Sequence, residues 1–300
     1  MLTKPNILVC TDFSSFSDLA LEAGKLIQSK TNGNLEVLHV LEQQVRWDWM
    51  PNETVSTQYP DTVEKQKFSE IHHRIKCEFE KKHFTAKFNL LSGIPSVAIL
   101  QEIQDKKIDL IIMGHRGHSG LFSIGSLTQK IVSSSPVPVL VIKEQFTPYR
   151  ISALVDPNNP MKKILSWAEE MAFLLSTKLS VISLFPDISA RFVGMAKVGH
   201  SSRILSFDQE EKDEVISNIK QKIRDSLTRH IEAELIVEFS TERKLAFHLN
   251  SVLEREKTDL AVMKRHQADF LEKILIGSET RRMLELAKSN LLILPPDEET

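Results

Sequence analysis

The chain repeats itself. Residues 109–114 read Asp-Leu-Ile-Ile-Met-Gly, and residues 259–264, 150 positions further on, read Asp-Leu-Ala-Val-Met-Lys. A second matching step, Ile-Gly-Ser, ends at Ser126 and again at Ser278, 152 positions later. Self-similarity at offsets of 150 and 152 residues in a chain of 300 residues indicates two copies of one structural unit. We therefore predict two domains, at residues 1–145 and 149–297.

Within each copy, short apolar segments alternate with amphipathic ones. The former are typical of buried parallel strands, and the latter repeat apolar residues at the spacing of one helix face. This alternation predicts an α/β fold of two tandem, open-twisted, mainly parallel five-stranded sheets with helices on both faces. The expected strands are 6–11, 35–41, 85–92, 108–113 and 137–143 in the first copy, and 150–155, 178–184, 233–239, 258–263 and 290–294 in the second.

The segment with the most chemistry follows the fourth strand of the first copy. Open parallel sheets bind ligands at the carboxyl ends of their strands, where the strand order reverses. Glycines in this segment would let the backbone take positive φ and approach a ligand closely. They are Gly114, Gly117 and Gly125. Because a helix is expected to begin at the Gly125-Ser126 step, free N–H groups and the positive end of its dipole would face one anion. Ser126 could add a hydroxyl donor or serve as a plain helix N-cap.

These residues carry a family resemblance. Residues 114–126 resemble the nucleotide loop of universal stress proteins, written G-x2-G-x9-G-[ST]. Residues 7–14 resemble the first strand and acidic turn of that family, and residues 136–141 resemble its last strand. The resemblance covers nearly all of residues 5–143 and, more weakly, residues 150–294. It implies an adenine-nucleotide alpha hydrolase-like fold and an adenine nucleotide (ATP, ADP or AMP) as a ligand.

The resemblance also implies roles for single residues. In ATP-binding members the acidic residue after the first strand contacts the adenine end, and the end of the second strand borders the base. The glycines and the Gly-Ser step hold the phosphates. Carried over, the nucleotide-binding positions are Asp12, Val40, Met113, Gly114, Gly117, Gly125, Ser126 and Thr128. For Asp12, the residue type fits a turn or a helix cap equally well.

Both copies depart from the family pattern. Seven residues, 118–124, separate Gly117 from Gly125, where the pattern has nine. Two extended residues span roughly 7 Å, so the shorter loop favours a shorter phosphate chain or none. The second copy has Lys264 and Gln267 at its first two glycine positions, and side chains there would obstruct a phosphate. We predict that the second copy binds no ATP in the family manner.

Two functions are consistent with this pattern. The first is a stress-response protein that binds an adenine nucleotide in its N-terminal domain as a regulatory ligand. The alternative is a nucleotide-free stress adaptor or scaffold that acts through protein partners or an apolar ligand. The loop has no Walker lysine and no dedicated general base, so we expect at most slow ATP hydrolysis and assign no catalytic residue. The residues leave open whether magnesium is involved.

Charge and composition indicate which partners and which cell compartment to expect. A net charge of −2 gives no basic field for a nucleic-acid partner. Two cysteines, Cys10 and Cys77, cannot form a disulfide framework, so we expect a reducing, cytoplasmic compartment. No apolar run is long enough for a membrane-spanning helix, and we expect no membrane partner. Family members often pair through their last strand, which implies an intramolecular pseudo-dimer through strands 137–143 and 290–294, with a homodimer also open.

Other candidate sites are weaker. His73 and Cys77 are four residues apart on an expected helix and would make half of a zinc site, but no second pair follows, so a structural role is favoured. Cys10 is expected to be a small buried residue. His115 either contacts a ligand or is solvated. The segments 43–60 and 185–207 are expected to be long loops.

Overall fold

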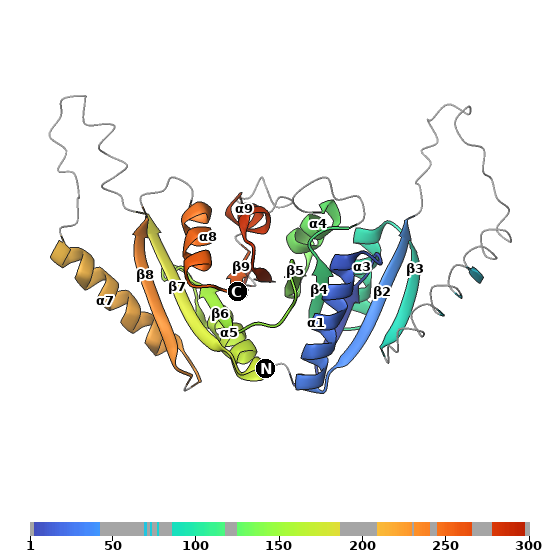
Figure 1. Cartoon of the computed structure of the whole chain (residues 1–300), viewed down its shortest axis with the longest axis horizontal. Helices are drawn as coiled ribbons and strands as arrows, with labels where there is room; N and C mark the ends of the chain where they lie inside the picture. The colour runs from blue at the N-terminus through green and yellow to red at the C-terminus, as the bar shows by residue number, and fades with distance from the viewer. Residues whose placement is uncertain are drawn as a thin grey trace, which may run out of the picture.

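The computed structural model describes residues 3–42, 69–70, 73, 77, 86–117, 125–186, 209–229, 231–240, 245–265 and 278–297. Within these residues, ten strands form one continuous sheet with helices on both of its faces (Figure 1). The protein therefore has the α/β fold class that the sequence predicts. No helix in the described part of the chain is long and apolar enough to cross a membrane.

The strand bounds agree with the predicted ones to within two residues. The first half contains β1 (Asn6–Cys10), α1 (Ser15–Thr31), β2 (Asn34–Glu42), β3 (Lys87–Gly93), α3 (Pro95–Asp105), β4 (Leu110–Gly114), α4 (Ser126–Ser134) and β5 (Val139–Ile142). The second contains β6 (Arg150–Leu154), α5 (Lys162–Leu175), β7 (Lys178–Pro186), α7 (Gln209–Ser226), β8 (Ala233–Ser240), α8 (Leu245–Arg255), β9 (Leu260–Lys264), α9 (Ser278–Leu286) and β10 (Asn290–Leu294).

The expected loop 185–207 is wrong at its start, because β7 continues to Pro186, where it still pairs with Ser240 of β8. The rest of that segment, and all of the expected loop 43–60, lie outside the described residues.

The order of strands is the same in the two halves. Across the sheet it reads β3-β2-β1-β4-β5-β10-β9-β6-β7-β8. Neighbours within each half are parallel, and β5 and β10 pair antiparallel at the centre. Leu140 faces Leu292 in that central pair, so the expected pairing of the two last strands is present. The two predicted sheets are thus joined into one.

Helix α1 illustrates how local sequence positions the carboxyl ends of the strands. It begins at the N-cap Ser14, whose hydroxyl accepts a hydrogen bond from the Ser17 amide at 3.3 Å, and its C-cap is Asn32 in the left-handed conformation. Its buried face includes Gly24, where a Cβ would lie 2.7 Å from the Val9 side chain on β1. The helix therefore packs tightly on β1 and leaves the turn before it at the sheet's carboxyl edge.

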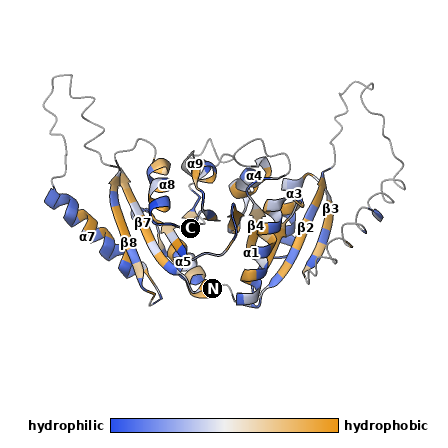
Figure 2. Cartoon of the chain, viewed as in Figure 1, coloured by the Kyte–Doolittle hydropathy of each residue, from blue (hydrophilic) through white to orange (hydrophobic). Residues whose placement is uncertain are grey.

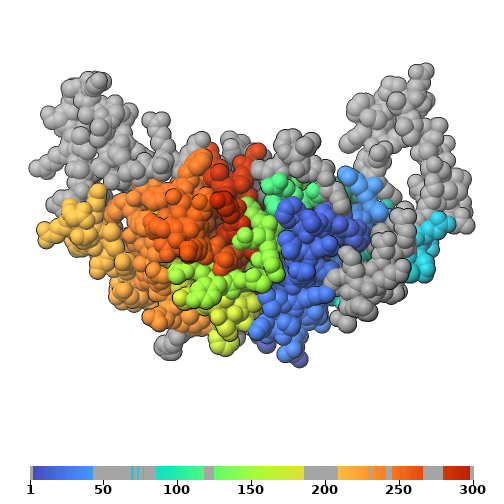
Figure 3. Space-filling view, in the orientation of Figure 1, coloured from blue at the N-terminus to red at the C-terminus, as the bar shows by residue number. Residues whose placement is uncertain are grey.

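The two halves share their hydrophobic cores. One core lies under α1, α5 and α7, and the other under α3, α4, α8 and α9; both contain buried side chains from each half. Leu140 and Leu292 at the central pair are fully buried, and Phe146 of the connecting segment is buried. Figure 2 shows the apolar strands at the centre of each half, and Figure 3 shows the halves in contact along the middle of the molecule. We infer one cooperative folding unit.

Candidate functional site

A cavity of about 450 Å³ opens at the carboxyl ends of β1, β2 and β4. Because β1 lies between β2 and β4, the chain leaves the sheet in opposite directions on its two sides, which opens a crevice at that edge. All eight residues that the sequence predicts to bind a nucleotide line this one cavity: Asp12, Val40, Met113, Gly114, Gly117, Gly125, Ser126 and Thr128. Its volume is in the usual range for small-molecule sites, about 300–1,000 Å³.

The first turn of α4 forms one end of the cavity. Gly125 is the N-cap, with φ −70° and ψ 139°, and its own N–H donates to the His115 carbonyl at 2.8 Å. The Gln129 amide makes the first bond of the helical ladder, to the Gly125 carbonyl at 3.1 Å. The N–H groups of residues 126–128 therefore precede the ladder, and all three residues line the cavity. This end of the cavity suits a negative charge.

The two hydroxyl side chains of this turn differ in their surroundings. Ser126 is not the helix N-cap; it is the first helical residue, and its side chain is exposed. Thr128 is buried, and its hydroxyl donates to the Gly114 carbonyl at 3.0 Å. Its proton therefore ties α4 to the end of β4, which leaves the hydroxyl only as an acceptor toward any ligand.

The three glycines differ in how much space a side chain would have at each position. A Cβ at Gly114 would lie 2.8 Å from the Phe16 Cβ and 2.9 Å from its carbonyl carbon, so close packing on α1 requires glycine there. A Cβ at Gly117 would overlap a carboxylate oxygen of Asp12. At Gly125 the nearest atom among the described residues would be 3.5 Å away, an ordinary contact, so these residues leave room for a Cβ there.

The expected positive φ is wrong for these three glycines. Among the described residues, the glycine with a left-handed backbone is Gly93, with φ 146°. The close approach that the sequence predicts at Gly117 is to protein: the Asp12 carboxylate stands over it.

Asp12 itself serves the turn after β1. One of its carboxylate oxygens accepts the Ser14 amide at 3.0 Å, which shapes the entry into α1. The turn role is thus confirmed, while the predicted contact to an adenine base stays a prediction. His39 supports the same turn: its Nδ1 donates to the Thr11 carbonyl at 2.7 Å, and its ring centroid lies 4.8 Å from that of Phe13.

His115 is neither solvated nor part of the cavity lining, contrary to expectation. It is 5% exposed, with its ring edge-on to Phe16 at a centroid distance of 4.2 Å. Burial lowers the pKa of its imidazole to about 4, and the charges of Arg116 and Lys143 act in the same direction. The neutral ring keeps a lone pair on Nε2, which accepts the Arg116 Nε–H at 2.8 Å. A buried histidine therefore holds Arg116 at the cavity.

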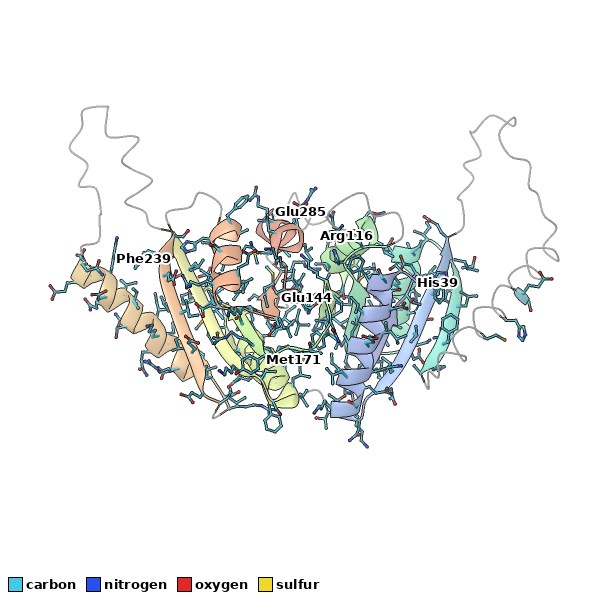
Figure 4. All side chains as sticks on the ribbon, viewed as in Figure 1. His39, Arg116, Glu144, Met171, Phe239 and Glu285 are labelled. Atoms are coloured by element: carbon cyan, nitrogen blue, oxygen red, sulfur yellow. The ribbon has the colours of Figure 1, made fainter. Side chains whose placement is uncertain are left out.

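The cavity is lined by both cationic and acidic side chains. Arg116 follows β4 and Lys130 lies on α4, while the carboxylates Asp12 and Glu42 lie at the ends of β1 and β2. The Asp12 carboxylate also lies against Gly117, next to Arg116. Figure 4 marks His39 on β2 and Arg116 after β4, both in the first half. The residues missing from the sequence prediction include Arg116, His39, Lys130 and Glu42. The sequence signal for Arg116 was its place between two predicted glycines.

In the second half, the side chains at the corresponding positions bond to other groups of the same half. Lys264 Nζ donates to Asp297 at 2.8 Å and to the Pro160 carbonyl at 3.3 Å. Asp156 accepts the Asn158 amide at 2.9 Å, as Asp12 does with its own turn. The other predicted obstruction, Gln267, lies outside the described residues.

The cysteine candidates are unpaired thiols. Cys10 is buried, and burial raises its thiol pKa to about 12, as expected for a small core residue. Cys77 Sγ lies 3.7 Å from His73 Nε2. No group of three or more potential metal ligands comes together among the residues that the structure describes.

Fold and cavity together define a doubly wound α/β protein whose strand ends enclose an anion-compatible pocket. The universal stress protein family model matches residues 5–143. The universal stress protein Slr1230 of a Synechocystis strain is 25% identical over 301 residues, covering 93% of this chain and 96% of its own. The universal stress protein MJ0577 of Methanocaldococcus jannaschii is 29% identical over 154 residues, covering 46% of this chain and 94% of its own.

Two solved structures share the fold over the whole chain. A universal stress protein from Archaeoglobus fulgidus has a TM-score of 0.64 at 16% identity and covers 97% of this chain and 98% of its own. A putative universal stress protein from Pseudomonas aeruginosa has a TM-score of 0.64 at 17% identity and covers 99% of this chain and 95% of its own. Residues 5–143 therefore belong to the universal stress protein family, and the similarity to Slr1230 extends over both halves of the chain.

Proposed function

We propose that this protein binds an adenine nucleotide in the cavity of its first half, as a regulatory ligand in a stress response. The observation that carries the proposal is the convergence of the eight predicted residues on one cavity that ends at the first turn of α4. In this proposal the chain divides at the predicted boundaries, with residues 1–145 as the ligand-binding domain and residues 149–297 as a domain without nucleotide.

The cationic side chains beside α4 and the apolar Val40 at the end of β2 favour a ligand with one anionic end and one aromatic end. The N–H groups of residues 126–128 and the charges of Arg116 and Lys130 would receive phosphate oxygens. The side of the cavity near Asp12 and Val40 would receive the base. AMP, ADP and ATP all have this polarity.

We propose a binding role rather than a catalytic one. The Asp12 carboxylate accepts the Ser14 amide and stands over Gly117, so its structural task is already defined. We also propose that the protein works in the cytoplasm, which is supported by the free thiols of Cys10 and Cys77. Cell fractionation with an antibody against the chain tests that location.

The direct test is to denature freshly purified protein and to assay the supernatant for adenine nucleotides by chromatography. A thermal-shift titration with AMP, ADP and ATP follows, because a ligand at 100 times its Kd stabilises the folded state by about 2.7 kcal/mol. Absence of released nucleotide together with no shift at millimolar ligand would favour the alternative function, a nucleotide-free adaptor.

Gly125→Ala separates ligand binding from folding. The described residues leave room for the added methyl group, with their nearest atom at 3.5 Å, so we expect the apo protein to lose only about 1 kcal/mol through a weaker N-cap. A phosphate against the main chain at this position would be displaced, so we expect at least about tenfold weaker ADP binding, or 1.4 kcal/mol. Unchanged ADP affinity would show that the ligand does not approach Gly125.

A further inference from the structure

The last turn of helix α4 contains a carbonyl that has no N–H donor within the helix itself. In an α-helix the Val132 carbonyl would accept the N–H of residue 136, but that residue is Pro136, which has none. The preceding carbonyl, that of Ile131, does accept the Ser135 amide at 2.8 Å. The last turn of α4 therefore presents an acceptor without a main-chain donor in the helical pattern.

Arg265 of the second half supplies the donor. Its Nη1 donates to the Val132 carbonyl at 2.6 Å, and its side chain is half-buried. Arg265 occupies the position that His115 has in the first half, 150 residues earlier. The main chain is equivalent at the two positions: the His115 amide donates to Ile142 and the Arg265 amide to Leu294, both at 2.9 Å. Only the task of the side chain differs.

The contact is also favourable electrostatically. A cation at the C-terminal end of a helix interacts well with the helix dipole. Lys143 makes the opposite contact across the seam, since its Nζ donates to the Leu284 carbonyl at 2.6 Å and to that of Ala287, at the end of α9. Each half thus caps the last helix of the other with a positive charge.

Helix α4 needs external support. It has nine residues, of which Thr128, Ile131 and Val132 are buried. Isolated helices of this length are marginal in water, so their position depends on packing and on their ends. At its N-terminal end α4 forms the anion-compatible end of the cavity, and at its C-terminal end it is held by Arg265.

We propose that Arg265 is a positioning residue for the nucleotide site: by holding the C-terminal end of α4, it orients the N–H groups of the first turn toward the phosphates. The second half then acts as a modulator of affinity at the first. This inference rests on the proposed nucleotide-binding function. Nine residues of helix extend about 13 Å, so Arg265 acts through α4 and does not touch the ligand.

Arg265→Met tests the proposal, because methionine keeps an unbranched apolar stem and removes the donor. We expect ADP to bind at least about fivefold more weakly, the lower range of typical coupling between sites. Amides of residues 129–134 should exchange hydrogen faster in the apo protein. Arg265→Lys keeps a cationic donor and should restore part of both. The matched control is Lys264→Met, the adjacent residue, whose contacts to Asp297 and Pro160 remain within the second half.

The ADP affinities and the α4 exchange rates together decide whether Arg265 positions the site. Weaker ADP binding and faster α4 exchange in Arg265→Met, with neither in Lys264→Met, support the positioning role. Faster exchange with unchanged ADP affinity, or no change in either, overturns it. If the unaltered protein binds no ADP, the proposed function fails, and α4 exchange then decides by itself whether Arg265 holds the helix. Should Arg265→Met fold poorly, Arg265→Lys and Lys264→Met are compared with the unaltered chain in the same two measurements.

Discussion

Replacing Ser126 with glutamate should weaken nucleotide binding without lowering the stability of the folded protein. Ser126 is the first residue of α4, its side chain is exposed, and it lines the cavity. Glutamate at this position faces the positive end of the helix dipole, which is worth about 0.3–1 kcal/mol to the folded state. The Ser126→Glu protein should therefore be as stable as the unaltered protein, or slightly more so, in the absence of ligand.

The same charge opposes a bound phosphate. Two unit charges 4 Å apart repel by about 4 kcal/mol at an effective dielectric constant of 20, and by about 1 kcal/mol in bulk water. For an exposed side chain at the edge of a cavity we take an intermediate value of about 2 kcal/mol. This predicts roughly thirtyfold weaker binding of ADP, since 1.4 kcal/mol corresponds to a factor of ten. Added salt should narrow the difference by screening the charges.

Calorimetric titration with ADP measures the effect on four proteins: unaltered, Ser126→Glu, Ser126→Gln and Ser278→Glu. Ser126→Gln controls for side-chain size without charge. Ser278→Glu places the charge at the first residue of α9, the matching helix of the second half. The reasoning is refuted if Ser126→Glu binds ADP as tightly as Ser126→Gln, or if Ser278→Glu weakens binding to the same degree.

Two further predictions concern the fold. Because burial holds the pKa of His115 near 4, below its unfolded value of about 6.5, the unfolded chain takes up the extra proton between these values. The unaltered protein should lose up to about 3 kcal/mol of stability as pH falls from about 6.5 to 4. Urea titrations of His115→Gln should show a flatter slope there; equal slopes contradict the assignment. Leu292→Asp places a carboxylate in the fully buried central strand pair and should cost about 3 kcal/mol or more. Calorimetry should still show one transition for the whole chain at a lower temperature, whereas a separate, unshifted transition for either half would argue against a shared core.

Much of this arrangement could be predicted from the sequence. Parallel strands covered on both faces form short apolar runs, which is why every strand bound was within two residues. The repeat predicted the order of elements along the chain. The strand-end rule pointed to the segment after the fourth strand, and the family resemblance implied eight residues from three separate segments, all of which line one cavity. The pairing of the last two strands was implied by the family resemblance and is present in the central sheet pair.

Features that depend on contacts between residues far apart in the sequence could not be predicted. Gly114 is required by the backbone of Phe16, 98 residues earlier, and nothing in the local pattern indicates that neighbour. The burial of His115 against Phe16 also requires the folded α1. Pro136 does signal that the Val132 carbonyl lacks a helical donor, but only the structure shows that Arg265 provides it.

The antiparallel pair of β5 and β10 has a consequence for how such a chain can evolve. In a symmetric dimer each substitution occurs in both subunits, so a change that improves one side of the contact also alters the ligand site of the other. When the two copies share one chain, each side of the contact mutates on its own. One copy can then carry an arginine, Arg265, at the position where the other has a histidine, His115. The second copy can hold a helix of the first in place, while the first copy keeps its cavity.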